Sequence, residues 1–261
     1  MKQAVLYVCH GSRIRQACDE AVSFIRRVQP HIEADIQEIC FLELAEPSIE
    51  EGFAACVRKG AEKIAVVPLL LLTAAHAKED IPKEVAEAAS LFPHVEVTYG
   101  KPIGVHEKLA ESVLKRVTEQ GNPGPGSLIV IVGRGSSDPD VARDLKEISL
   151  LVKDRAGGSE VDIAFVTAAK PSLDDMLDRV AGMNDKRIFL VPYLLFTGLV
   201  MREVMRKALS VPHKDLTVCR YLGYDSGVEE VFTERVQEAV SNRDGAFDFI
   251  YEGKTHASIN D

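Results

Sequence analysis

Several signals that would assign a chain of this size to another class of protein are missing. The five cysteines form no C-x-x-C pair, which argues against an iron–sulfur cluster or a zinc ribbon and fits a reducing cytosol. No apolar stretch approaches the length of a membrane span. Acidic residues outnumber basic ones by 40 to 31, and the net charge of −9 argues against a general role on nucleic acid or on a membrane surface. We therefore expect a cytoplasmic protein that binds neither nucleic acid nor membrane.

Three catalytic motifs are also absent. The glycine-rich segment at residues 133–137 is not followed by the lysine that a P-loop requires. Cys9 precedes His10 where a histidine phosphatase has arginine, and no G-x-S-x-G elbow is present. These absences weigh against a hydrolase, which stays an alternative. The first 13 residues contain one lysine and an apolar run too short for a signal peptide, so we expect them to form a strand.

What the sequence does contain is an internal repeat. Ile188–Thr197 repeats Ile64–Thr73 with six of ten letters identical, 124 positions later. Residues 120–127, QGNPGPGS, hold too much proline and glycine for a helix or a strand and indicate a linker. Repetition over most of the chain predicts two similarly folded halves, which we place at residues 1–120 and 127–261. The polar tail beyond Ser241 is expected to be partly frayed.

Strand-like and helix-like segments alternate within each half. Two local signals are clear in the first half: Ser48 and Glu51 form a capping box at a helix start, and Gly60 stops that helix. The first half of Ile64–Pro82 is an apolar run typical of a strand buried on both faces. The order predicts an α/β fold with two repeated subdomains, each a mainly parallel four-stranded sheet flanked by helices, and a cleft between them. The other expected elements of the first half are strands at Ala4–Cys9, Ile36–Leu42 and Val95–Tyr99, and helices at Arg15–Gln29, Lys83–Leu91 and Gly104–Thr118.

The two halves differ at three residues that can bind metal or move protons. Scaffold letters such as Gly11 and Pro47 persist in the second half, whereas these three do not. A residue that the fold needs would be expected in both copies, so the difference indicates function confined to the first half. The three residues are His10, Glu43 and His76, and their counterparts 124 positions later are Arg134, Thr167 and Val200.

The geometry of a parallel sheet would bring these three side chains together. Each stands at or just past the end of an expected strand, and neighbouring strands lie about 4.8 Å apart. Two imidazoles and a carboxylate are a normal ligand set for a divalent first-row metal, and three ligands with open positions are typical of a working site. The alternative is that each histidine is an ordinary hydrogen-bonded residue and that Glu43 is a surface or capping acid.

The motifs around these residues resemble those of the class II tetrapyrrole chelatases, and most of all those of the sirohydrochlorin chelatases. The resemblance extends to about residue 240, with the motifs in matching order and spacing. It implies insertion of Fe²⁺ into sirohydrochlorin with release of two protons, in sirohaem synthesis; the alternative within the family is Co²⁺ insertion in cobalamin synthesis. The motifs are H-G-S-R at 10–13, F-L-E at 41–43 followed by Pro47-Ser48, V-V-P-L-L-L at 66–71 and H-x-x-x-D-I-P at 76–82.

The resemblance also implies roles for individual residues. His10 and His76 would be catalytic metal ligands and Glu43 an assisting carboxylate. Short family members pair as homodimers, and this chain resembles such a dimer fused with one site decayed, so we expect a monomer. No permanently bound cofactor is implied, since Fe²⁺ enters as substrate and Co²⁺ or Ni²⁺ can replace it. The turn along the macrocycle would be formed by Leu71, Leu72, Thr73, Ala74 and Ala75.

Basic side chains are needed to bind this substrate, because sirohydrochlorin carries many carboxylates and the protein is acidic. Arginine pairs well with carboxylates. Each candidate could equally be a solvated surface charge. The candidates, which lie beside the motifs of the two halves, are Arg13, Lys78, Arg134, Lys170 and Arg202.

A second hypothesis is a non-catalytic, two-lobed protein that closes on a tetrapyrrole or a metal. It explains the duplication, but not why three reactive residues are lost from one half alone. It predicts ligand binding without metal insertion, which distinguishes it from a chelatase.

Overall fold

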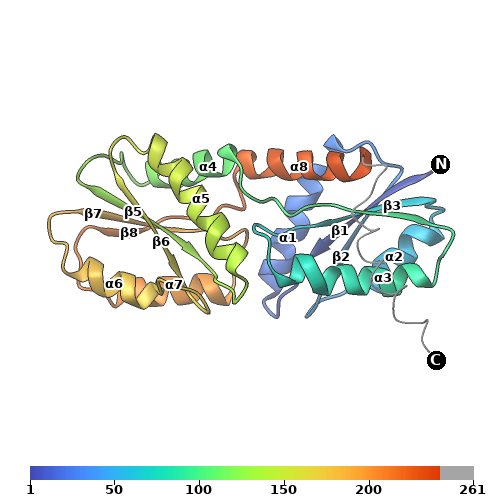
Figure 1. Ribbon diagram of the computed structural model, residues 1–261, viewed down its shortest axis with the longest axis horizontal. Coiled ribbons are helices and arrows are strands. Elements are labelled where there is room, and N and C mark those ends of the chain that lie inside the picture. Colours follow the sequence, from blue (N-terminus) through green and yellow to red (C-terminus); the bar gives the residue numbers. More distant parts are fainter. Residues whose placement is uncertain (242–261) are drawn as a thin grey trace, which may run out of the picture. The chain divides into compact units, whose positions relative to one another are not determined.

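The computed structural model describes residues 1–241 and divides the chain into two compact units. Unit 1 comprises Met1–Ile103 and the chain from Glu229 onward, and unit 2 comprises Gly104–Val228. Each unit has a four-stranded parallel sheet with helices on both faces (Figure 1). This confirms the predicted α/β class and the two repeated subdomains. The tail beyond Ser241, for which fraying is expected, lies outside the described residues.

Unit 1 is organised around its first strand. Neighbouring strands are parallel throughout, in the order β2-β1-β3-β4. The strands are β1 (Gln3–Cys9), β2 (Ile36–Phe41), β3 (Lys63–Pro68) and β4 (Glu96–Tyr99). The helices are α1 (Arg15–Val28), α2 (Ile49–Arg58), α3 (Ile81–Ser90) and α8 (Ser226–Ser241), with a 3₁₀ turn at Gln29–His31 and a π-helical turn at His76–Asp80.

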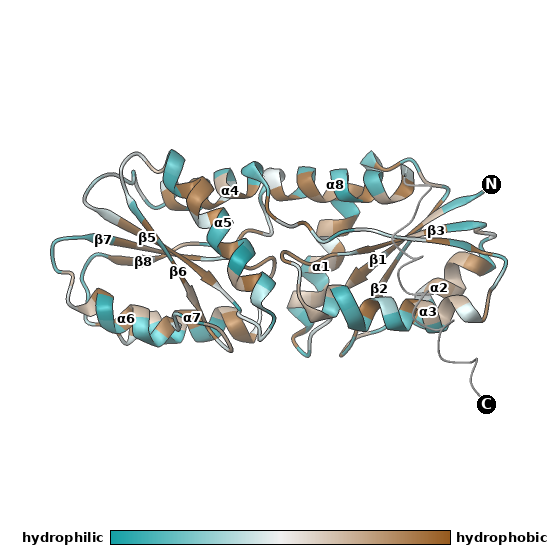
Figure 2. Ribbon diagram, in the orientation of Figure 1, coloured by the Kyte–Doolittle hydropathy of each residue, from teal (hydrophilic) through white to brown (hydrophobic). Residues whose placement is uncertain are grey.

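Alternation along β1 determines what each face of its sheet contacts. Leu6 belongs to the core that α2 and α3 close with Phe53 and Val85. The neighbouring Tyr7 points to the other face, where its ring lies 6.2 Å from that of Phe232 of α8. Successive strand residues point to opposite faces, so helices on both sides bury β1 from Ala4 to Cys9. Figure 2 shows the strands of both units as largely hydrophobic.

Unit 2 repeats this plan. Its strands are parallel, in the order β6-β5-β7-β8. The strands are β5 (Ser127–Gly133), β6 (Glu160–Phe165), β7 (Arg187–Pro192) and β8 (Leu216–Val218). The helices are α4 (Glu107–Thr118), α5 (Pro139–Arg155), α6 (Leu173–Ala181) and α7 (Leu199–Leu209). Among residues 1–241, none of the helices combines the length and the hydropathy that crossing a membrane requires.

The last helix of each sequence repeat belongs to the unit formed by the other repeat. Helix α4 lies in unit 2, where its Ser112 hydroxyl donates to the Asp225 carboxylate at 2.8 Å. Most of α8 lies in unit 1, where the Thr98 hydroxyl donates to the Ala239 carbonyl at 2.9 Å. The ranges 1–120 and 127–261 therefore describe sequence repeats, and as domain boundaries they stay a prediction.

The third strand is shorter than the apolar run that predicts it. It ends at Pro68, and β7 ends at the equivalent Pro192. Proline has no N–H to donate to a ladder, which favours a strand end there. The expectation of a strand buried on both faces therefore holds only as far as Pro68, and residues 70–75 beyond it are half-buried. Helical structure then begins at His76, earlier than the expected start at Lys83.

Candidate active site

His10 and Glu43 are brought together by backbone hydrogen bonds that continue the β1–β2 pairing beyond the strand ends. Cys9 pairs with Phe41 as the last step of the ladder. The Glu43 N–H then donates to the His10 carbonyl at 3.1 Å. The side chains meet as well, with His10 Nδ1 3.6 Å from Glu43 Oε1. At this distance a proton could pass between the two side chains through one water molecule.

Gly11 allows this close approach of two turns. Its φ is +90°, and a Cβ at this position would lie 1.7 Å from the Glu43 carbonyl oxygen. Gly135 repeats the arrangement in unit 2, with a φ of +91° and a Cβ position 1.8 Å from the Thr167 carbonyl oxygen. The glycine-rich segment at 133–137 is therefore a closely packed copy of the first turn.

His76 reaches the same place from the loop after β3. Its ring lies edge-on to the His10 ring, with centroids 4.8 Å apart and planes at 89°. Its Nδ1 lies 2.7 Å from Asp80 Oδ2 at the other end of the π-helical turn. The Tyr99 hydroxyl donates to the Ala77 carbonyl at 2.9 Å, which ties this turn to β4.

The three candidate residues thus form two neighbouring pairs that share His10. All three are accessible: the exposed fractions of the side chains of His10, Glu43 and His76 are 26%, 49% and 35%. Within residues 1–241, no three His, Cys, Asp or Glu groups already stand as a ligand set around one point. The roles of the three residues stay proposals.

The equivalent positions of unit 2 hold no such pairs. The Thr167 hydroxyl donates to the Arg134 carbonyl at 3.1 Å, so this side chain is hydrogen-bonded to the backbone of the turn. Val200 is the second residue of α7, which begins where unit 1 has its π-helical turn. The chemical asymmetry of the sequence is thus accompanied by a difference in local backbone.

The expected substrate contacts divide between the units. Residues 71–75 form the half-buried segment that leads into His76. Arg13 and Lys78 are exposed in unit 1. The other candidate cations, Arg134, Lys170 and Arg202, are exposed in unit 2, where Lys170 Nζ contacts Asp175 Oδ2 at 2.9 Å. Their role in binding substrate stays a prediction.

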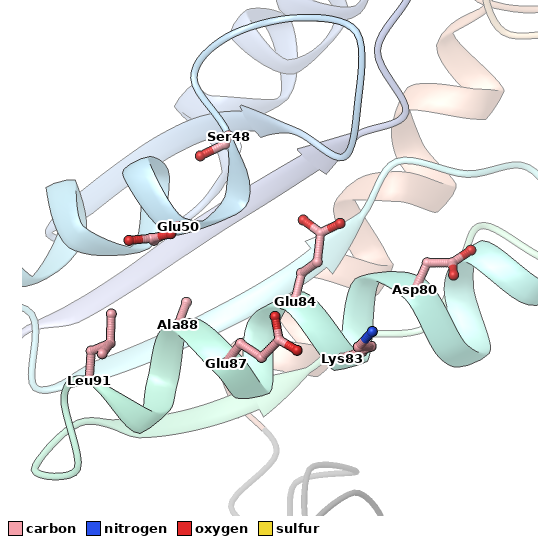
Figure 3. A pocket seen from close by; sticks show the side chains of 8 residues that line it. All are labelled: Ser48, Glu50, Asp80, Lys83, Glu84, Glu87, Ala88 and Leu91. Carbon is pink, nitrogen blue, oxygen red and sulfur yellow. The ribbon is translucent and has the colours of Figure 1, made fainter.

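A groove of about 530 Å³ between α2 and α3 was not expected from the sequence (Figure 3). Burial, and then the nearby Glu87 and Asp80 carboxylates, raise the pKa of Glu84 in this groove. The spacing of Asp80, Glu84 and Glu87 along one helix face was the signal available in the sequence. The lining residues are Ser48, Glu50, Asp80, Lys83, Glu84, Glu87, Ala88 and Leu91.

Comparison with known proteins places this arrangement in a family. The CbiX family matches the chain twice, over residues 4–120 and 128–239. A sirohydrochlorin ferrochelatase of Bacillus subtilis is 45% identical over 260 residues, covering 99% of both chains. A sirohydrochlorin cobaltochelatase of Priestia megaterium is 34% identical, covering 91% of this chain and 80% of that protein. The structure of SirB from Bacillus subtilis with Fe³⁺ has a TM-score of 0.89 at 45% identity, covering 95% of this chain and all of that one.

Proposed function

This chain belongs to the CbiX family, and on that premise we propose that it is a sirohydrochlorin ferrochelatase, which inserts Fe²⁺ into sirohydrochlorin and releases two protons. The observation that carries the proposal is the contact of His10 with both Glu43 and His76 in unit 1. Iron is favoured over cobalt because the relatives named for iron are the more similar.

Metal capture is the first task of this site. Neutral imidazoles bind Fe²⁺, Co²⁺ and Ni²⁺ well, so His10 and His76 would take the metal as substrate from solution. The two rings are close neighbours, with centroids 4.8 Å apart, so one ion could contact both once the rings turn toward it. Because a histidine must lose its proton before it binds metal, acid weakens this step.

Proton removal is the second task. Each metal insertion releases two pyrrole N–H protons from the macrocycle. We assign His10 as the acceptor and Glu43 as the relay, since Oε1 of Glu43 lies 3.6 Å from Nδ1 of His10 and its side chain is half exposed to water.

The macrocycle would lie along residues 71–75, which lead directly into His76. The basic side chains of Arg13, Lys78 and Arg134 would hold its carboxylates. The groove between α2 and α3 is unsuited to this anionic substrate, because four of its eight lining residues are acidic. A cleft between the two halves as the place of binding stays a prediction.

Two properties of the whole protein follow from the proposal. One chain contains both repeats that short relatives of this family supply by pairing, so we propose a monomer. All five cysteines are free thiols and lie within the described chain, which suits a reducing compartment, and we propose the cytoplasm.

The direct test is to mix purified protein and sirohydrochlorin anaerobically with Fe²⁺, Co²⁺ or Ni²⁺ and to follow the absorption spectrum. We expect catalytic conversion to the metallated spectrum, fastest with Fe²⁺. Faster turnover with Co²⁺ would favour the cobaltochelatase alternative. Binding of sirohydrochlorin without metallation would instead identify a carrier and overturn the proposal.

A further inference from the structure

We propose that Asp80 is a positioning residue that holds the His76 ring with Nε2 toward the metal; this rests on the proposed function of the site. The contact between His76 Nδ1 and Asp80 Oδ2, at 2.7 Å, is within the range of a good hydrogen bond. A carboxylate can only accept this bond, so the proton resides on Nδ1. Nε2, on the opposite edge of the ring, then carries the lone pair that binds a metal.

The backbone around this pair restricts how the ring can be placed. His76 and Asp80 are the first and last residues of the π-helical turn, and the N–H of Ile81 donates to the His76 carbonyl. Tyr99 holds the second residue of the turn through the Ala77 carbonyl. Such turns are rare and occur frequently at functional sites. With both backbones fixed, one hydrogen bond is enough to select the orientation of the ring.

A capping role does not explain Asp80. Its backbone is helical, with φ −68° and ψ −54°, and within the described chain its side chain makes no capping hydrogen bond to α3. Its side chain is half exposed, so the core does not require it either. The carboxylate instead contacts His76.

The second repeat has lost this pair as a unit. The residue 124 positions after Asp80 is Val204, which is fully buried in α7, just as His76 is replaced by Val200. An acid that served the scaffold would be expected in both repeats. Asp80 therefore joins the three residues that distinguish the first half, although the sequence comparison did not single it out.

The test compares Asp80→Ala, Asp80→Asn and the control Glu79→Ala, an exposed acid of the same turn. Co²⁺ is titrated into each protein without tetrapyrrole, and its visible absorption is followed. We expect Asp80→Ala to weaken Co²⁺ affinity by about 10- to 100-fold, the usual effect of losing the partner of a ligating histidine. Asn retains an acceptor oxygen, so Asp80→Asn should restore part of the affinity, and Glu79→Ala should bind normally.

A second readout separates positioning from folding. Nitrogen-15 spectra of the metal-free protein should show His76 with its proton on Nδ1, and Asp80→Ala should remove that preference while circular dichroism stays unchanged. Unchanged Co²⁺ affinity in Asp80→Ala, or an equal loss in Glu79→Ala, would overturn the inference. Failure of the unmodified protein to bind Co²⁺ would instead count against the proposed function.

Discussion

Unit 1 and unit 2 share the backbone of their turns but differ in the side chains that the turns present. Gly11 and Gly135 have nearly the same positive φ and the same close contact with the neighbouring turn. Ser48 and Ser172 each begin a helix with a capping box. The two units also share a cis peptide bond, before Pro47 and Pro171, and a residue with positive φ, Leu44 and Ala168.

This comparison separates what the fold needs from what the chemistry needs. The shared glycines allow two turns to approach and the shared capping boxes satisfy backbone groups, so each unit requires its own copy. The pairs that involve His10 and His76 have no counterpart at the equivalent positions of unit 2, so the fold of that unit does not require them. Loss of the second copy would therefore cost little stability, which explains how Thr167 and Val200 can occupy these positions.

The largest effect should come from removing His10, the histidine that contacts both Glu43 and His76. His10→Ala is expected to lower the rate of metal insertion by at least about 100-fold, since it would remove the proposed metal ligand and proton acceptor. The matched variant at the equivalent position, Arg134→Ala, should raise KM for sirohydrochlorin and leave kcat nearly unchanged. Initial rates with Fe²⁺ measure both, and thermal unfolding checks the fold. Near-normal turnover of His10→Ala would refute the assignment.

A smaller effect, on stability, should be equal in the two units. Gly11→Ala and Gly135→Ala should each destabilise their unit by on the order of 3 kcal/mol, because the new Cβ would overlap a carbonyl oxygen at a positive φ. Denaturant unfolding measures this loss. Only Gly11→Ala should also impair Co²⁺ binding under conditions where the protein remains folded. Impaired Co²⁺ binding in folded Gly135→Ala would show that unit 2 contributes to the metal site.

The smallest effects should come from the capping boxes. Ser48→Ala and Ser172→Ala should each lower the free energy of unfolding by about 1 kcal/mol without affecting metal binding. Unfolding in urea at neutral pH measures both. A cost at one position only would show that the two helix starts are not equivalent.

The capping box of unit 2 also predicts a pH dependence. Hydrogen bonds from the Ser172 hydroxyl and from Lys170 lower the pKa of Asp175 to about 2. A carboxyl group in an unfolded chain titrates near pKa ~3.9, so the stabilisation is present above that pH and is lost as the pH falls toward the folded value. Asp175→Asn should flatten the acid limb of stability against pH, measured by urea unfolding. An unchanged acid limb would contradict the assignment.

Most of the local structure could be predicted from the sequence, because short-range patterns determine it. The capping box at Ser48, the helix stop at Gly60 and the parallel order of strands all follow from spacing and residue type, and all are confirmed. The candidate site could be predicted because the two repeats of the chain can be compared with each other. His10, Glu43 and His76 of the first repeat are all replaced in the second. The end of the third strand could not be predicted. The apolar residues of Leu69–Thr73 fit a paired strand and an unpaired segment equally well.

The sequence by itself determined that two similar α/β halves exist and that the candidate reactive residues are confined to the first. The repeat, and the positions at which its two copies differ, can be read directly from the sequence. Tertiary structure alone decided that α4 and α8 belong to the opposite units, since either sheet could bury a similar apolar helix face. It also decided that Asp80 contacts His76 instead of capping α3, because that depends on a π-helical turn held by Tyr99 from a distant strand.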